Sequence, residues 1–474
     1  MSSAPESFAT LPLNPALLGN LSDLGYHHMT LVQQQTLPPI IAGRDVIARA
    51  KTGSGKTAAF GLGLLQALDV QSLRVQALVV CPTRELADQV AKEIRRLARA
   101  IANVKVVALC GGTPIGPQIG SLQHSAHIVV GTPGRLLKHL TKETLHLRGL
   151  RTLVLDEADR MLDMGFEEEL EQILGHLPAE RQTLLFSATY PPAIADVSAR
   201  VQRDPVLVDV TEDELPVAVV QRWCEVGRDD RDQQLHRALA AWGGVRNVVF
   251  CNTKADCAQL AAALTAGGIA AVALHGDLDQ HDRTEVLVRF SNGSASVLVA
   301  TDVAARGLDI DDVDAVFNYE LPGQPEVYVH RIGRTARAGK TGIAVSLVAG
   351  RELPRLHAIE AQLPGVELQQ CEVPAGGQSP ATLTPVMLTV EINGGRKHKL
   401  RPGDLLGTLT AAGGIPGDAV GKIDLFDNNG YVAVKRDQAA HGVRQLNAQK
   451  IKGRQFRARI VGKPSSGDPA VGDR

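Results

Sequence analysis

Short, continuously apolar runs alternate with amphipathic stretches along most of the chain, and this alternation limits the possible folds more than any other feature. The runs that suit strands are Ala77–Cys81, Val104–Leu109, Leu153–Asp156, Thr183–Ser187, Val248–Cys251, Val272–Leu274, Val297–Thr301 and Ile343–Val348. Between them lie stretches such as Glu85–Ala100, whose leucine, valine and isoleucine residues recur at helical spacing. Strands that are apolar on both faces and separated by helices predict an α/β fold with parallel sheets covered on both sides.

The alternation is interrupted at two places, which we interpret as linkers. Residues 212–216 are acidic and contain a proline, and residues 372–385 are rich in Pro, Gly, Ser and Thr. A chain of 474 residues suits about three domains. We therefore expect α/β lobes at residues 1–211 and 217–371, a smaller domain at 386–462 and a disordered tail at 463–474.

The smaller domain shows a β-α-β-β-α-β pattern. The expected elements, in order, are Met387–Ile392, Asp404–Ala412, Lys422–Phe426, Tyr431–Val434, Ala439–Leu446 and Gln455–Val461. From residue 380 onward there are 15 Lys and Arg against 8 Asp and Glu, a net charge of +7, while the rest of the chain carries −8. A basic segment on a nearly neutral protein favours a polyanionic partner, and a solvated basic surface remains the alternative.

Cysteine usage and hydropathy place limits on the cellular environment. The six cysteines include no CxxC pair, which favours buried or incidental thiols in a reducing cytosol. The first residues, MSSAPESFAT, contain no basic and apolar leader, and no run approaches the ~18 apolar residues of a membrane span. We expect a soluble cytoplasmic protein with no membrane partner.

A phosphate-binding loop is predicted where the strand Val46–Ala48 leads through AKTGSGKT into the helical TAAFGLGLLQAL. Glycines let backbone N–H groups close around phosphates, and the positive end of the helix adds to the attraction. Lys56 is expected to reach the β- and γ-phosphates of ATP, and Thr57 to hold Mg²⁺. The predicted loop contacts are Thr52, Gly53, Ser54, Gly55, Lys56 and Thr57.

Two carboxylates follow the apolar run Leu153–Leu155, in the tetrapeptide Asp156-Glu157-Ala158-Asp159. We expect Asp156 to hold the Mg²⁺ shell and Glu157 to orient and deprotonate the attacking water. An isolated acidic tetrapeptide is more often a solvated turn or a helix cap. Its position at a strand end, downstream of a phosphate loop, favours the catalytic interpretation.

A third candidate segment is HRIGRTAR at residues 330–337. Arg334 and Arg337 lie three residues apart, so on a helix they share one face. Two such cations can stabilise a transferring γ-phosphate, a contribution of about 10³–10⁵ in rate in related systems. A surface helix with ordinary ion pairs is the alternative.

Together with further motifs, these segments resemble the DEAD-box RNA helicases in order over residues 8–348. The resemblance implies that Gln33 reads the adenine edge and that Phe8 stacks on the adenine ring, although Leu31 stands where many members have proline. It implies a ribose or γ-phosphate contact for Asp309, and coupling of hydrolysis to RNA release for Ser187 and Thr189. The RNA-backbone contacts that it implies are Thr83, Arg84, Gly112, Thr132, Arg135, Gly276, Arg283 and Thr301.

The small domain has the pattern of an RNA-recognition motif and resembles the C-terminal domain of the DbpA subfamily at residues 394–397, 401–404 and 421–423. That resemblance implies binding of a large-subunit ribosomal RNA hairpin. Only Tyr431 could stack on a base in the strand 429–434. Recognition is therefore expected to depend on hydrogen bonds and basic side chains, with contacts from Arg396, Lys397, Tyr431 and Lys452.

The resemblance thus implies two tandem RecA-like parallel-sheet domains followed by a small α+β domain. The implied activity is ATP- and Mg²⁺-dependent separation of short RNA duplexes on pre-ribosomal particles during large-subunit assembly, with no stable protein partner inferred. An ATP-locked RNA clamp, whose hydrolysis only times release, is the alternative. The adenine-reading motif and the RNA-type third domain disfavour a DNA translocase.

Overall fold

The computed structural model describes residues 6–50, 53–190, 192–210, 219–227, 230–305, 313–336, 341–362, 368–374 and 383–462. These residues form two compact units, 6–210 and 219–462. The predicted linker 212–216, residues 375–382 of the predicted linker 372–385, and the predicted tail lie outside the described residues. Within the described ranges, every helix is too short or too polar to cross a membrane.

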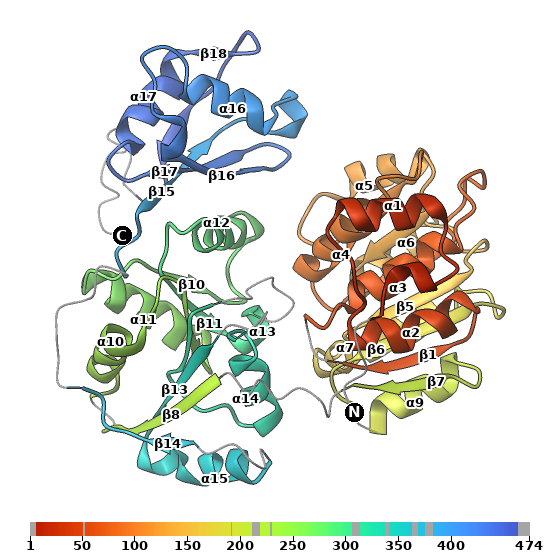
Figure 1. The fold of residues 1–474 in the computed structure, drawn as a ribbon, viewed down its shortest axis with the longest axis horizontal. Helices are drawn as coiled ribbons and strands as arrows, with labels where there is room; N and C mark the ends of the chain where they lie inside the picture. The colour runs from red at the N-terminus through yellow and green to blue at the C-terminus, as the bar shows by residue number, and fades with distance from the viewer. Residues whose placement is uncertain are drawn as a thin grey trace. The chain divides into compact units, whose positions relative to one another are not determined.

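The first unit, called lobe 1 below, contains a seven-stranded parallel sheet in the order β3-β4-β2-β5-β6-β1-β7. Figure 1 labels its strands β5, β6, β1 and β7. Its strands are β1 (Val46–Arg49), β2 (Ala77–Val80), β3 (Val106–Leu109), β4 (Ile128–Gly131), β5 (Thr152–Asp156), β6 (Gln182–Ser187) and β7 (Val206–Asp209). The central strands β2, β4 and β5 are buried at every residue. This burial matches the apolar runs of the sequence.

Helices cover both faces of this sheet and create two separate cores. The helices are α1 (Pro15–Asp23), α2 (Leu31–Ile41), α3 (Lys56–Gln66), α4 (Arg84–Leu97), α5 (Ile115–Gln123), α6 (Pro133–Thr141), α7 (Ala158–Asp163), α8 (Glu167–Leu174) and α9 (Pro192–Val201). Leu184 and Phe186 of β6 face the core under α3 and α4, while Leu185 faces the opposite core under α8 and α9. Successive strand residues point to opposite faces, so one apolar strand serves both cores.

The second unit contains lobe 2, whose sheet repeats this plan in the order β10-β11-β9-β12-β13-β8-β14. Its strands are β8 (Val219–Glu225), β9 (Asn247–Cys251), β10 (Ala271–Leu274), β11 (Val297–Thr301), β12 (Ala315–Asn318), β13 (Gly342–Val348) and β14 (Gln369–Gln370). Its helices are α10 (Arg231–Trp242), α11 (Lys254–Ala266), α12 (Gln280–Ser291), α13 (Asp302–Ala305), α14 (Pro325–Ile332) and α15 (Leu353–Gln362). The predicted pair of parallel-sheet α/β domains is confirmed.

The remaining residues of the second unit form a small domain with an antiparallel sheet in the order β16-β17-β15-β20. The elements are β15 (Met387–Ile392), α16 (Pro402–Leu409), β16 (Val420–Leu425), β17 (Gly430–Lys435), α17 (Ala439–Ala448) and β20 (Ala458–Ile460). A hairpin of β18 (Lys450–Ile451) and β19 (Arg454–Gln455) precedes β20. The strand predicted at 455–461 therefore begins later than expected, because Gln455 pairs within the hairpin.

One face of this small sheet packs on α12 of lobe 2 instead of facing solvent. Val288 of α12 lies in an apolar cluster with Tyr431 and Val461. Beside this cluster, Asn292 Nδ2 donates to Thr389 Oγ1 at 3.0 Å. The opposite face of the sheet is covered by the domain's own helices α16 and α17. Both faces of the sheet are therefore occupied.

Candidate functional site

The phosphate loop lies at the carboxyl end of β1, where Gly53 and Gly55 adopt left-handed backbone conformations with φ of 86° and 97°. Gly55 is the N-cap of α3. A Cβ atom at this position would lie 2.5 Å from Gln33 Nε2, so both the backbone conformation and the close approach require glycine. Lys56 is 6% exposed and its Nζ donates to Ala50 O at 3.0 Å. The predicted contact Thr52 lies outside the described residues.

Gln33 lies directly against this loop. Its Nε2 donates to Gly55 O at 3.1 Å, and its Oε1 accepts from the backbone N–H of Thr30 at 2.9 Å. Phe8, in a short 3₁₀ turn (Phe8–Thr10), is 3% exposed and packs edge-to-face on Tyr26. The prediction that Phe8 stacks on adenine is not supported in this conformation, because the core of lobe 1 covers the ring.

Asp156 ends β5 and is 2% exposed. Its Oδ1 atom has no hydrogen-bond partner among the described residues. Burial raises the pKa of Asp156 to about 7, while the positive charge of Lys56 opposes that rise. A buried, unpaired carboxylate oxygen beside a phosphate loop fits a hard cation such as Mg²⁺. Thr57, in the first turn of α3, offers a second oxygen at the same edge of the sheet.

This raised pKa predicts a pH-dependent effect of Asp156→Asn on nucleotide-free stability. The neutral carboxyl's contribution is fully present below about pH 3.8 and is lost as the pH rises through about 7, because the fold must then bury a charge. At pH 8 the variant should be more stable than wild type by about 1–3 kcal/mol, and the difference should shrink by pH 5.5. Thermal unfolding at both pH values measures this, with the exposed Asp196→Asn as control. An equal difference at both values would contradict it.

Glu157 is the N-cap of α7 and has a φ of 51°, which is uncommon for a residue with a side chain. Its Oε2 accepts a hydrogen bond from Arg160 Nη1 at 2.7 Å in a buried ion pair. The Arg160 guanidinium thus lies directly against the Glu157 carboxylate and gives it an opposite charge inside the protein. Arg160 is a neighbour of the proposed base that the sequence interpretation did not identify.

Asp159, the last carboxylate of the tetrapeptide, forms hydrogen bonds with the segment that follows β6. Asp159 Oδ2 accepts from both the backbone N–H and the hydroxyl of Thr189, at 2.9 and 2.8 Å. Ser187 Oγ accepts from the backbone N–H of Asp159 at 3.3 Å. Burial opposes ionisation of Asp159, but the hydrogen bonds of Thr189, the charge of Lys56 and the Ser187 hydroxyl together lower the pKa of Asp159. The two predicted coupling residues therefore contact the carboxylate segment directly.

The predicted RNA contacts of lobe 1 follow β2, β3 and β4. These strands form the other half of the sheet edge that carries the phosphate loop and Asp156. Thr83 and Arg84 follow β2, Gly112 follows β3, and Thr132 and Arg135 follow β4. A Cβ atom on Gly112, whose φ is 73°, would lie 1.5 Å from the Arg84 Nη1 atom. The Arg135 guanidinium donates to Thr113 O at 2.8 Å. The structure thus gathers these residues at one place.

In lobe 2 the predicted RNA contacts also lie at the carboxyl ends of the parallel strands or close to them. Gly276 follows β10 and Thr301 ends β11. Arg283 of α12 donates from Nη2 to Ala304 O at 3.0 Å, close to the same strand ends. Asp309, the predicted nucleotide contact, lies outside the described residues.

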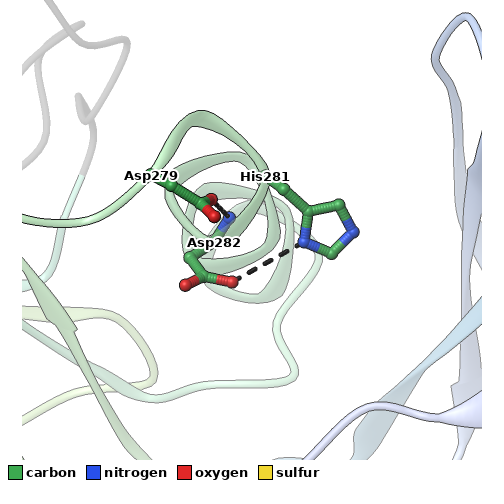
Figure 2. A group of neighbouring side chains, drawn as sticks. All are labelled: Asp279, His281 and Asp282. Carbon is green, nitrogen blue, oxygen red and sulfur yellow. Dashed lines mark hydrogen bonds and ion pairs between the residues drawn. The ribbon is translucent and has the colours of Figure 1, made fainter.

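The N-cap and first turn of α12 also carry Asp279, His281 and Asp282, whose potential ligand atoms lie within 4.8 Å of one another (Figure 2). Asp279 Oδ1 accepts from the backbone N–H of Asp282 at 2.8 Å and caps the helix. His281 Nδ1 lies 3.6 Å from Asp282 Oδ1. All three side chains are exposed. The helix cap and the contact between His281 and Asp282 account for their placement.

The prediction that Arg334 and Arg337 share a helical face is wrong for Arg334, because α14 ends at Ile332 with Gly333 as its C-cap. Arg334 follows that end and is 5% exposed. Arg337 lies outside the described residues. Within α14, Arg331 is 1% exposed and its guanidinium contacts Asp302 through two hydrogen bonds of 2.7 Å.

The small domain carries a cluster of basic side chains away from its sheet. A 3₁₀ turn (Arg396–His398) and the β18–β19 hairpin are joined by Lys452, whose Nζ reaches Lys399 O at 2.7 Å and Asp404 Oδ2 at 2.6 Å. The exposed cations of these segments and their flanks, called the basic loop surface below, are Arg396, Lys397, Lys399, Arg401, Lys450, Lys452, Arg454 and Arg457.

The prediction that Tyr431 stacks on an RNA base is wrong in this structure. The ring is 1% exposed and packs edge-to-face on Phe426, with Val288 of α12 in the same cluster. Its hydroxyl lies among Glu391 and Asn429. The tyrosine is part of the contact between the small domain and lobe 2.

Comparison with family models agrees with this arrangement. Residues 30–197 match the DEAD/DEAH box helicase model, residues 231–339 the helicase conserved C-terminal domain, and residues 389–460 the DbpA RNA binding domain. These matches fall on lobe 1, lobe 2 and the small domain in turn.

Individual relatives show the same assignment. The chain is 52% identical to the ATP-dependent RNA helicase DbpA of Escherichia coli over 96% of its own length and 99% of the relative's. It is 46% identical to the DEAD-box ATP-dependent RNA helicase CshA of Geobacillus kaustophilus, covering 75% and 76% of the two chains. The solved structure of S. cerevisiae Dbp5 bound to RNA and ADP BeF3 aligns at 29% identity with a TM-score of 0.71, covering 78% of this chain and 96% of that one. The chain therefore belongs to the DEAD-box ATP-dependent RNA helicases, and within them to the DbpA type.

Proposed function

We propose that this protein hydrolyses ATP with Mg²⁺ to separate or remodel short RNA duplexes in the cytoplasm, and that its C-terminal domain directs it to a hairpin of large-subunit ribosomal RNA. The process served would be assembly of the large ribosomal subunit on pre-ribosomal particles.

The main support for this proposal is that the carboxyl edge of the lobe 1 sheet is divided into two groups of residues. Residues suited to ATP follow β1, β5 and β6, while residues suited to an RNA backbone follow β2, β3 and β4. Threonine hydroxyls, glycine N–H groups and arginines at strand ends fit phosphate contacts that do not read bases. One rigid sheet thus offers a nucleotide site and a strand site side by side.

The catalytic assignment follows from the carboxylates. Bound Mg²⁺ would be held by Asp156 and Thr57 and would neutralise charge on the phosphates. Glu157, oriented by its ion pair with Arg160, would accept a proton from the attacking water. Lys56 would contact the β- and γ-phosphates.

Coupling between the two halves would run through Asp159. Its carboxylate is the hydrogen-bond acceptor for Thr189, and its backbone N–H bonds to Ser187. A change at the carboxylates after hydrolysis would therefore reach the segment after β6 without an intermediate residue. This supports the assignment of Ser187 and Thr189 to coupling.

Arg334→Ala is expected to lower kcat by about 10²–10³-fold with little change in the KM for ATP, because a transition-state cation contributes chiefly to turnover. Steady-state ATPase measurements at saturating RNA test this. Arg351→Ala, an exposed arginine of the same lobe, serves as control. An unchanged kcat in Arg334→Ala would assign this arginine a purely structural role.

The basic loop surface supports the proposed binding of ribosomal RNA. The sheet face on which an RNA-recognition motif stacks bases is covered by α12. The exposed cations lie instead on loops joined through Lys452. RNA bound there would be held by hydrogen bonds and phosphate contacts, without aromatic stacking on Tyr431.

Arg396→Ala should weaken binding of a ribosomal hairpin about 3–30-fold and reduce the dependence of log Kd on log salt by about 0.7–0.9, the effect of one lost phosphate contact. Fluorescence anisotropy over a series of salt concentrations measures both. Tyr431→Leu, which removes the aromatic ring, is the comparison variant and should bind like wild type when folded, because the ring is buried. Weaker binding by folded Tyr431→Leu alone would instead place RNA at the sheet.

The alternative is an ATP-locked RNA clamp that uses hydrolysis only for release. The predicted catalytic set is Lys56, Asp156, Glu157, Arg334 and Arg337, and its presence in the sequence favours an enzyme that turns over. A clamp that hydrolyses ATP for release would need the same residues. A single-turnover assay on a short duplex separates the two functions. Strand separation that requires ATP supports the helicase, whereas binding without separation supports the clamp. ATPase activity against a panel of RNA fragments then tests the preference for ribosomal RNA.

A further inference from the structure

Two thiols lie in contact at the edge of the lobe 2 sheet. Cys224 belongs to β8, and Cys371 directly follows β14. Their Sγ atoms are 3.0 Å apart. Neither residue belongs to a motif for ATP or RNA, so their proximity is not explained by the proposed helicase function.

The strand register places these cysteines opposite one another. Gln370 pairs with Trp223 in the parallel ladder, and the backbone N–H of Cys371 continues it by donating to Trp223 O at 2.9 Å. Adjacent strands lie about 4.7–4.9 Å apart, within the Cα separation of about 4.4–6.8 Å that disulfides require. The sulfur atoms need only approach to about 2.05 Å for a bond to form.

The two thiols differ in access and reactivity. Cys224 is 1% exposed, and burial followed by the hydrogen bond with Cys371 raises its pKa. Cys371 is only partly buried. Thiolate character and access decide which cysteine reacts first, so an oxidant would meet Cys371 before Cys224.

We propose that Cys224 and Cys371 form a reversible disulfide, a modification site at the junction between lobe 2 and the C-terminal domain. The oxidant is a low-molecular-weight disulfide. The Cys371 thiolate attacks one sulfur of the oxidant, forming a mixed disulfide and releasing one small thiol. Cys224 then loses its proton and attacks Cys371 Sγ, releasing the second small thiol. Two protein thiols are oxidised and one small disulfide is reduced to two thiols.

The position of this bond gives it a structural consequence. β14 has only two residues and lies at the sheet edge, so few ladder hydrogen bonds hold it. Cys371 begins the segment that leads toward the C-terminal domain, and Val373 packs on the lobe 2 core near it. A cross-link to β8 would fasten this segment, and it would join residues 147 positions apart in the chain. Long closed loops give the largest restriction of the unfolded chain.

The test is incubation of the full-length protein with oxidised glutathione, followed by non-reducing peptide mapping and intact-mass measurement. Wild type should lose two hydrogens, link the peptides containing Cys224 and Cys371, and recover both thiols with dithiothreitol. Cys224→Ser should instead accumulate glutathione at Cys371, because the second step has no thiol. Cys371→Ser should gain neither modification at Cys224. Cys257→Ala, which lacks another buried thiol of lobe 2, should cross-link like wild type.

Thermal unfolding supplies a second readout. Oxidised wild type should melt several degrees above reduced wild type, and Cys371→Ser should show no such rise. Stable glutathione on Cys371 of wild type without the cross-link would overturn the proposal. Equal melting temperatures of oxidised and reduced wild type, with the cross-link present, would overturn its role in fastening the segment.

Discussion

Glu157→Gln should abolish ATP turnover while leaving ATP and RNA binding intact. Glu157 stands at the carboxyl end of β5 beside the proposed Mg²⁺ ligand Asp156, and is proposed to act on water and not on the nucleotide. Removing a general base typically costs about 10²–10⁴-fold in rate. Glutamine keeps the length of the side chain and can still accept a hydrogen bond from Arg160. RNA-stimulated kcat, measured with nucleotide and RNA affinities on the same preparation, tests the expectation.

The control for this variant is Glu168→Gln, an exposed glutamate of α8 in the same lobe, which should turn over like wild type. Loss of a buried charge partner also affects Arg160, so thermal unfolding should accompany the kinetics. A folded Glu157→Gln protein that hydrolyses ATP at close to the wild-type rate would remove Glu157 from the role of base. Reduced turnover with equally reduced ATP affinity would assign it to binding.

The placement of the phosphate loop, Asp156 and Ser187 at one sheet edge could be predicted because each follows an apolar run that becomes a strand. The run ending at Asp156 is β5, and the run ending at Ser187 is β6. Parallel strands bring their carboxyl ends to one edge, so local patterns were enough to gather the site. The pairing of Asp159 with Thr189 could not be predicted in this way, since it joins residues 30 positions apart through side-chain geometry.

Two errors have different physical origins. The helical face assumed for Arg334 ignored Gly333, which ends α14, and glycine after a helical run is a recognised stop signal. The error at Tyr431 had no such local signal. Alternation along β17 correctly places Tyr431 on the face opposite Val432, but its cover is Val288, from α12 of lobe 2. A strand pattern does not reveal which distant element covers a face.

Deleting the C-terminal domain should convert specific activation by ribosomal RNA into weak activation by any RNA. The predicted RNA contacts of the two lobes suit backbone phosphates, which give affinity without sequence choice. When ribosomal RNA is present at a limiting concentration, loss of a tethered second binding site should reduce its activation of the ATPase about 10²–10⁴-fold. The deletion should begin at residue 386, because Leu383 is fully buried in the lobe 2 core and Ser296 Oγ donates to its carbonyl at 2.7 Å. A deletion from residue 380 would remove this core residue as well.

The deletion also uncovers α12, so a second variant must separate lost RNA binding from a disturbed helix. Arg396→Ala combined with Lys452→Ala keeps the domain on Val288 but removes two charges from the basic loop surface. Both proteins should lose the preference for ribosomal RNA when ATPase activation by ribosomal and unrelated RNA is compared at one salt concentration. If only the deletion lost it, the preference would depend on other residues of the domain or on its contact with α12, and not on Arg396 and Lys452. If the truncated protein kept the preference in full, specificity would reside in the two lobes, and the basic loop surface would have no part in choosing the RNA.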